Sequence, residues 1–136
     1  MPTRMTTLDR PATSPGTLPR SARRNAAGDM VARYAENIGI ALQPSSVQLG
    51  SGARVVVDGA AADQRVVVEA CTASAPLTHL DLACAAQDVF TLALIRSSHP
   101  QTSTVLLVAD EAVRDAVAAT VARTPASGGL EIAVCP

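Results

Sequence analysis

Asp58 and Glu69 are the residues whose type and spacing could most directly do chemistry. Each ends a short run of valines in the stretch RVVVDGAAADQRVVVEA, which covers residues 54–70. Carboxylate oxygens are the ligands that Mg²⁺ prefers in proteins, so two adjacent acids could hold such an ion. An arginine also precedes each valine run, at Arg54 and Arg65. The same pattern could therefore form two salt bridges in a plain hairpin.

The pairing register of the two valine strands decides between these alternatives. If Asp58 lies opposite Arg65, then Arg54 lies opposite Glu69, and the two acids are roughly 13 Å apart along the ladder. If a two-residue turn joins the strands instead, Asp58 lies opposite Glu69 and the acids could share a divalent ion. We favour the salt-bridge register, because it pairs all four charges without a metal. Each such pair contributes about 0.2–1 kcal/mol.

The elements that must position these acids follow the order αβββαβαβ, which predicts an α/β domain with a mixed sheet flanked by helices. Helical spacing of apolar residues predicts a first helix over 28–42, with Asp29 capping its start. A Rossmann-like half-domain is the alternative, favoured by the closing βαβ unit but not by the early hairpin. The other predicted helices run from after Pro76 to about Ser97 and over 111–123, and Asp110 and Glu111 open the second of them. The predicted strands are 47–49, 54–58, 65–71, 104–108 and 130–134.

Composition divides the 136-residue chain into two parts. Residues 1–27 are rich in Pro, Ser, Thr and Arg and lack a hydrophobic period, which predicts a disordered tail. Residues 28–136 form the single predicted domain, and their six arginines and eleven acids give a formal charge of −5. An acidic domain is poorly suited to non-specific binding of nucleic acid.

Two further absences in the sequence narrow the class of protein. No apolar run approaches the roughly 18 residues of a membrane span, so no membrane role is expected. The three cysteines are scattered without a CxxC pair, which predicts no zinc site and fits a reduced cytoplasm.

The element order and the two acids together resemble the restriction-endonuclease-like PD-(D/E)XK superfamily. That resemblance implies an opening helix, a three-strand meander with Asp on the second strand and Glu on the third, and then a helix and a strand. The segment GDMVARY at residues 28–34 is similar to the Gly-Glu-x-x-Ala-x-Arg-Tyr opening of small bacterial members. The match extends to about Ala109 and implies a bacterial protein with a nuclease-like fold.

The resemblance implies a set of site residues. Asp58 takes the place of the metal-binding Asp, and Glu69 that of the motif Glu. Asp29 takes the place of the acid on the first helix, with Glu36, seven residues later, as a second candidate. Gln87 on the second long helix could approach the same site. If the protein is active, these residues would hold and surround Mg²⁺.

The superfamily's lysine, two residues after the Glu, falls on Cys71, and the chain contains no lysine at all. Arg54 or Arg65 could stand in for its charge, but arginine is a poor proton acceptor at neutral pH. We therefore expect a non-catalytic interaction or scaffold module with no cofactor, binding a protein partner or a second copy of itself. The alternative is a Mg²⁺-dependent nuclease that uses Asp58 and Glu69, for which nucleic-acid binding has weak support.

Overall fold

The computed structural model describes residues 20–125 and 128–135. Within these residues the elements follow the predicted order αβββαβαβ. None of the described helices has both the length and the apolar character needed to cross a membrane. The bounds of the elements are α2 Arg20–Ile38, β1 Gln43–Gln48, β2 Arg54–Ala60, β3 Val66–Cys71, α3 His79–Ser98, β4 Ser103–Val108, α4 Glu111–Val121 and β5 Glu131–Val134.

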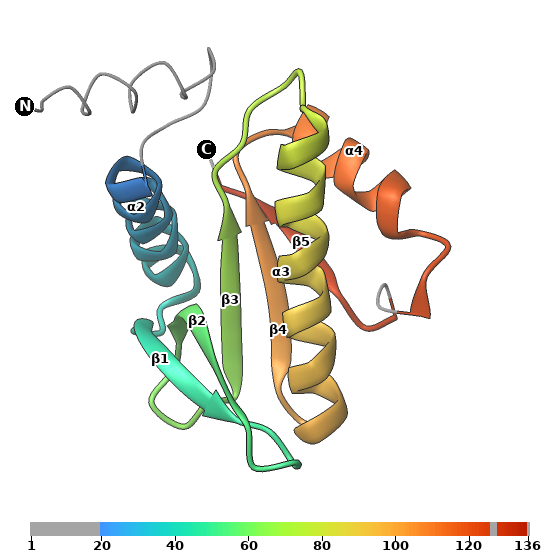
Figure 1. The fold of residues 1–136 in the computed structure, drawn as a ribbon. Helices are drawn as coiled ribbons and strands as arrows, with labels where there is room; N and C mark the ends of the chain where they lie inside the picture. Colours follow the sequence, from blue (N-terminus) through green and yellow to red (C-terminus); the bar gives the residue numbers. More distant parts are fainter. Residues whose placement is uncertain (1–19, 126–127, 136) are drawn as a thin grey trace, which may run out of the picture.

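The strands form one mixed sheet in the order β1-β2-β3-β4-β5 (Figure 1). The first three pair antiparallel, whereas β4 pairs parallel to both β3 and β5. The predicted mixed sheet flanked by helices is confirmed. The Rossmann-like alternative is not, because two of the four strand pairs are antiparallel.

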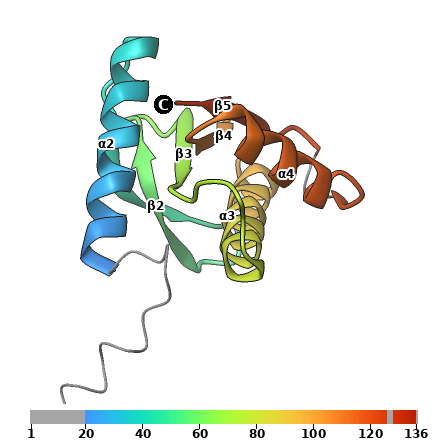
Figure 2. The same ribbon diagram turned by 90° about the horizontal axis from the view of Figure 1, so that it is seen from above.

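Helices cover both faces of the sheet. Figure 2 shows α2 on one side and α3 and α4 on the other, and the two buried clusters follow this division. On β4, Leu106 and Val108 face α3 and α4, while Val105 and Leu107 face α2. All four are at most 2% exposed. A strand that is apolar at every position is expected where a sheet is covered on both faces.

The first helix differs from its prediction at both ends. It begins at Arg20 rather than Gly28, so the predicted boundary between tail and domain falls inside α2, and Asp29 lies in its third turn rather than at its cap. It ends at Ile38, because Gly39 adopts a left-handed φ of 71° and its N–H bonds the carbonyl of Ala35. Glycine favours this conformation at a helix end. Residues 1–19 of the predicted tail lie outside the described residues.

The other two helices begin at polar caps. Thr78 and Asp81 form a reciprocal capping box at the start of α3. At the start of α4, the side chain of Asp110 accepts a hydrogen bond from Val113 N–H at 2.9 Å. The predicted capping of the third helix by Asp110 is therefore confirmed, and this acid satisfies a backbone donor that the helix leaves unpaired.

A carboxylate cluster where two strands diverge

The predicted salt-bridge register is wrong. β2 and β3 pair Gly59 with Val68 and Ala60 with Val67, and one further step along the strands brings Asp58 opposite Glu69. This is the register that the sequence allowed as the alternative. No ion pair joins either acid to an arginine among the described residues.

The two arginines are used elsewhere. Arg54 donates to Ser46 Oγ at 3.0 Å and to Gln48 Oε1 at 3.3 Å, both on β1. Arg65 lies exposed in the loop that joins β2 to β3. Neither guanidinium is therefore placed to balance the two acids or to replace the missing lysine.

Burial of two alanines explains this register. The salt-bridge register needs a six-residue loop that would remove Ala60 and Ala61 from the sheet, yet both are buried, at 3% and 7% exposure. In the observed structure Ala61 N–H donates to Val66 O at 3.0 Å, so the loop between these two residues is 62–65, and Gln64 in it takes a positive φ of 59°. Packing of buried side chains outweighs exposed charge pairs, which contribute at most about 1 kcal/mol each.

A β-bulge sets the direction of Asp58. β1 and β2 pair Ser45 with Val57, but the next pair is Gln43 with Ala60. Two steps on β1 therefore match three on β2. The extra residue falls in the Asp58-Gly59 segment, and Val57 and Ala60 consequently face the same core. Bulges commonly redirect a side chain near functional sites.

Gly59 is required beside this bulge for a steric reason. A Cβ at this position would lie 2.7 Å from Cγ1 of Val31 on α2 and 3.1 Å from Cγ2 of Val68. Both neighbours are β-branched and cannot turn aside easily. The absence of a side chain lets α2 approach the sheet next to Asp58.

The two carboxylates bridge the gap where β2 leaves β3. The Asp58 N–H donates to Glu69 Oε1 at 2.9 Å, and the Ala70 N–H donates to Asp58 Oδ2 at 2.8 Å. Each acid thus accepts a hydrogen bond from the backbone of the opposite strand. These bonds replace the backbone ladder, whose last paired residues here are Gly59 and Val68.

Asp88 completes a cluster of three acids, and sequence reasoning missed it. It lies on α3 one turn after Ala85 and one turn before Leu92, which are both buried. Its position thus belongs to the stripe of α3 that packs on the sheet. A single acid within an apolar stripe at helical spacing is the signal that could have found it.

Burial keeps protons on two of these acids. Burial and, after it, the negative charges of Asp58 and Asp88 together raise the pKa of Glu69 to about 8, while the hydrogen bond from the Asp58 N–H opposes the shift. Burial likewise raises the pKa of Asp88 to about 7, with the charge of Asp58 as the second cause. Near neutral pH, Glu69 is mainly protonated and shares a side-chain hydrogen bond with Asp58.

Cys71, which the resemblance would align with the superfamily's lysine, is a buried, neutral thiol. Its side chain is 6% exposed and packs in the core beneath α3. Burial raises the pKa of the thiol, and the charge of Asp88 adds to the shift. The cluster therefore receives no positive charge at the point where the resemblance would require one.

The other predicted site residues do not join the cluster. Asp29 and Glu36 are both exposed on α2, about half a turn away from the stripe of Met30, Val31 and neighbouring residues that packs on the sheet. Gln87 is exposed on α3, on the side opposite the buried stripe. The structure brings Asp58 and Glu69 together, adds Asp88, and leaves these three residues apart.

The cluster has the donor type for Mg²⁺ but not the arrangement. Carboxylate oxygens suit a hard cation. However, no group of three or more His, Cys, Asp or Glu side chains in residues 20–125 and 128–135 is arranged to hold a metal ion. One oxygen of Asp58 and one of Glu69 already accept backbone hydrogen bonds, so no reaction step is derived through a metal.

In comparisons with known proteins, no family model, no curated protein and no solved structure matched the chain. The resemblance to the restriction-endonuclease-like superfamily therefore stays a prediction from the sequence.

Proposed function

We propose that the protein is a non-catalytic interaction module built on a restriction-endonuclease-like scaffold, and that it works in the cytoplasm of a bacterium. The observation that carries this proposal is the use of Asp58 and Glu69 as acceptors for backbone N–H groups across the gap between β2 and β3. These bonds complete the sheet, and they leave fewer carboxylate oxygens to hold a metal ion for catalysis. The neutral Cys71 and the charge of −5 on residues 28–136 support the same conclusion.

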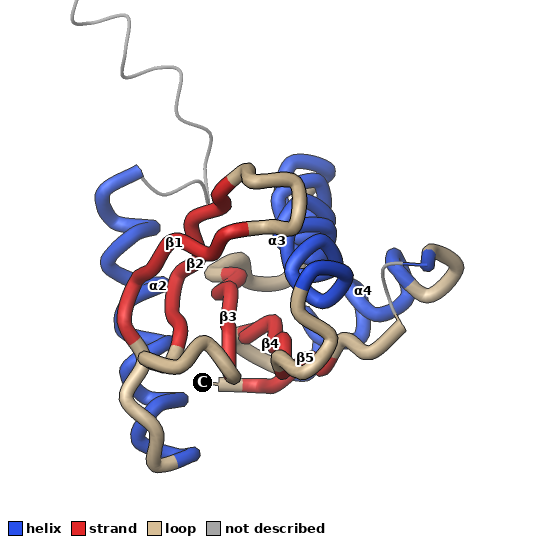
Figure 3. The backbone as a smooth tube through the Cα atoms, turned by 90° about the horizontal axis from the view of Figure 1, so that it is seen from below, coloured by secondary structure: helices blue, strands red, loops and turns tan. Residues whose placement is uncertain are grey.

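The outward face of α3 offers a surface for a protein partner. Phe90, the single phenylalanine of the chain, is 59% exposed, and Leu80 on the same helix is 62% exposed. Ala83 and Ala86 are exposed between them, at the spacing of three and four residues that forms one helix face. Figure 3 shows α3 along the outside of the molecule.

A second copy of the chain is the partner we propose for this face. Sedimentation velocity should show self-association of the parent at high micromolar concentration, and Phe90→Glu should remain monomeric, because it replaces the largest apolar side chain of the face by a charge. Ala119→Glu, on the exposed side of α4, is the matched control and should behave as the parent. A parent that stays monomeric throughout the concentration range would exclude self-association through α3.

A Mg²⁺-dependent nuclease is the second candidate, and the register favours it. Asp58 and Glu69 come from neighbouring strands to one place, with Asp88 next to them. Three acids close together create repulsion that a divalent cation would relieve. If the site is loaded, the ion would supply Lewis-acid chemistry, and Asp58 and Glu69 would hold it.

A metal titration separates the two candidates. For the interaction module, Mg²⁺ or Mn²⁺ at pH about 7.5 should leave the amide NMR signals of Asp58, Glu69 and Ala70 unchanged apart from uniform salt effects. DNA and RNA should remain uncleaved. The nuclease would be favoured over the interaction module by two results together. The amide signals would change locally and saturably in the parent but not in Glu69→Gln, and the parent would cleave nucleic acid in a metal-dependent way.

A further inference from the structure

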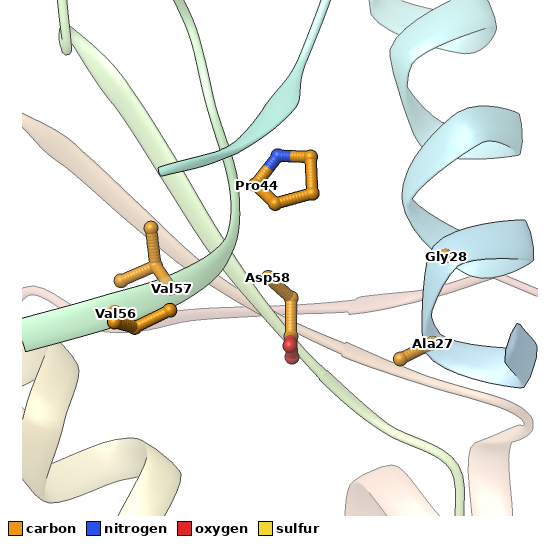
Figure 4. A pocket seen from close by; sticks show the side chains of 6 residues that line it. All are labelled: Ala27, Gly28, Pro44, Val56, Val57 and Asp58. Atoms are coloured by element: carbon orange, nitrogen blue, oxygen red, sulfur yellow. The ribbon is translucent and has the colours of Figure 1, made fainter. Parts of the chain in front are cut away.

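A cavity of about 280 Å³ lies beside Asp58, between α2 and the β1–β2 pair. Figure 4 shows the carboxylate of Asp58 projecting into the space between the strands and α2. The volume lies just below the roughly 300–1,000 Å³ of pockets for drug-sized ligands, so it suits a group about as large as one side chain. The lining residues are Ala27, Gly28, Pro44, Val56, Val57 and Asp58.

Asp58 is the single charged group that the described residues contribute to this lining. The carboxylate is half-buried, and among the described residues no basic side chain forms an ion pair with it. The neighbouring acid, Glu69, holds a proton near neutral pH because its pKa is raised to about 8. The cavity therefore combines one negative charge with walls of aliphatic carbon.

The walls select against a divalent ion at this place. Ca²⁺ and Mg²⁺ need six or more oxygen ligands, whereas the cavity provides one carboxylate and otherwise the side chains of alanine, proline and valine. A ligand that carries one positive charge on an aliphatic chain matches both the carboxylate and the apolar walls of this cavity. The charge can pair with the Asp58 carboxylate, and the aliphatic part can remove apolar wall from water.

We propose that this cavity binds an aliphatic guanidinium group, either on a small ligand or on an arginine side chain. The planar guanidinium can donate two parallel hydrogen bonds to a carboxylate, which favours it over an ammonium ion. The chain itself holds eleven arginines and no lysine. Two of them, Arg4 and Arg10, lie in the segment that precedes α2, the helix whose Ala27 and Gly28 line the cavity.

The length of that segment allows the chain's own arginine as a source. From Arg20 to Gly28 the helix advances about 12 Å. The ten residues from Arg10 to Arg20 can span up to about 33 Å when extended. Arg10 could therefore return to the cavity. The site is separate from the α3 face, so this inference and the proposed self-association fail or succeed independently.

The test is a titration of the full-length protein with propylguanidinium chloride, followed at the amide signals of Gly28, Asp58 and Ala70. Ala70 reports on the site because its N–H bonds the Asp58 carboxylate. Saturable shifts at these amides are expected, with at least about tenfold weaker binding of the neutral analogue propylurea, since it lacks the charge. Equal binding of propylurea would overturn the proposal.

Two variants remove different halves of the site. Asp58→Asn removes the charge but keeps an oxygen to accept the Ala70 N–H, and Gly28→Leu fills the cavity from a position where an added Cβ meets nothing within 4 Å. Both should weaken propylguanidinium binding about tenfold or more. Ala119→Glu on α4 should bind as the parent does. Unchanged binding in both site variants would show that the ligand lies elsewhere and would overturn the proposal.

The source of the guanidinium is read from an arginine variant of the full chain. If Arg4→Gln/Arg10→Gln binds propylguanidinium more tightly than the parent does, the chain's own arginine occupies the cavity. Equal binding by both proteins assigns the site to a separate ligand. Absence of saturable shifts in both proteins would overturn the proposal.

Discussion

Raising the pH from about 5 to about 9 should lower the free energy of unfolding by a few kcal/mol, on the order of 2–5 kcal/mol. Glu69 and Asp88 have folded-state pKa values of about 8 and about 7, above the ordinary values of 4.5 and 3.8. Between these limits the folded protein binds more protons than the unfolded chain does. Stability is therefore fully present below the ordinary pKa values and is lost as the pH rises through the folded ones.

Urea denaturation at a series of pH values measures this loss, and Glu69→Gln assigns it. The glutamine oxygen can still accept the Asp58 N–H, and the amide can donate to the Asp58 carboxylate, so the variant resembles protonated Glu69. It should be more stable than the parent by about 1–3 kcal/mol near pH 9 and within about 1 kcal/mol of it near pH 5. If parent and variant lost stability in parallel, Glu69 would not be the buried acid responsible.

Asp88→Leu should also stabilise the fold near pH 9, by about 1–3 kcal/mol. Asp88 lies within the stripe of α3 that contains Ala85 and Leu92. At a pH above the pKa of Asp88, which is about 7, the parent must keep a charged carboxylate between α3 and the sheet. A leucine at this position would instead extend the apolar contact between α3 and the sheet. Near pH 5, where Asp88 is largely protonated, the gain should be smaller.

Ala119→Leu is the control for Asp88→Leu. Ala119 lies on the exposed side of α4, outside the α3 face proposed for self-association, so the same new side chain should change stability by no more than about 0.5 kcal/mol at either pH. The measurement is again urea denaturation. A lower stability of Asp88→Leu near pH 9 would contradict the prediction and would mean that the carboxylate makes a polar contact the fold requires.

Local patterns predicted the order of elements well. Valine runs, apolar residues at helical spacing and the cap at Asp110 each depend on neighbouring residues, and these elements occur where predicted to within a few residues. The ends of α2 were harder. The predicted end at residue 42 is too late, because β1 begins at Gln43 and holds Pro44, which an edge strand tolerates. The left-handed Gly39 ends the helix instead.

The candidate site depended on information that one strand does not contain. The order of charged residues in the sequence favoured a register with Asp58 opposite Arg65. The burial of Ala60 and Ala61 decides the register instead, and that burial requires both covering helices. The bulge at Asp58-Gly59 arises from pairing with β1. Asp88 enters the cluster only because α3 packs above Glu69, so its part in the site is a tertiary property.

We expect the divergence of β2 from β3 to divide the sheet into two parts of unequal stability. β1 and β2 pair over most of their length, whereas β2 joins β3 through two backbone pairs, the hydrogen bond from Ala61 N–H to Val66 O and the two carboxylate bonds. Amide hydrogens along this hairpin should therefore exchange with solvent through local opening, without global unfolding. Glu69 lies at the junction between β2 and β3. Loss of its proton should therefore weaken the attachment of the β1–β2 hairpin before the rest of the fold, and local opening of this hairpin should become more frequent as the pH rises.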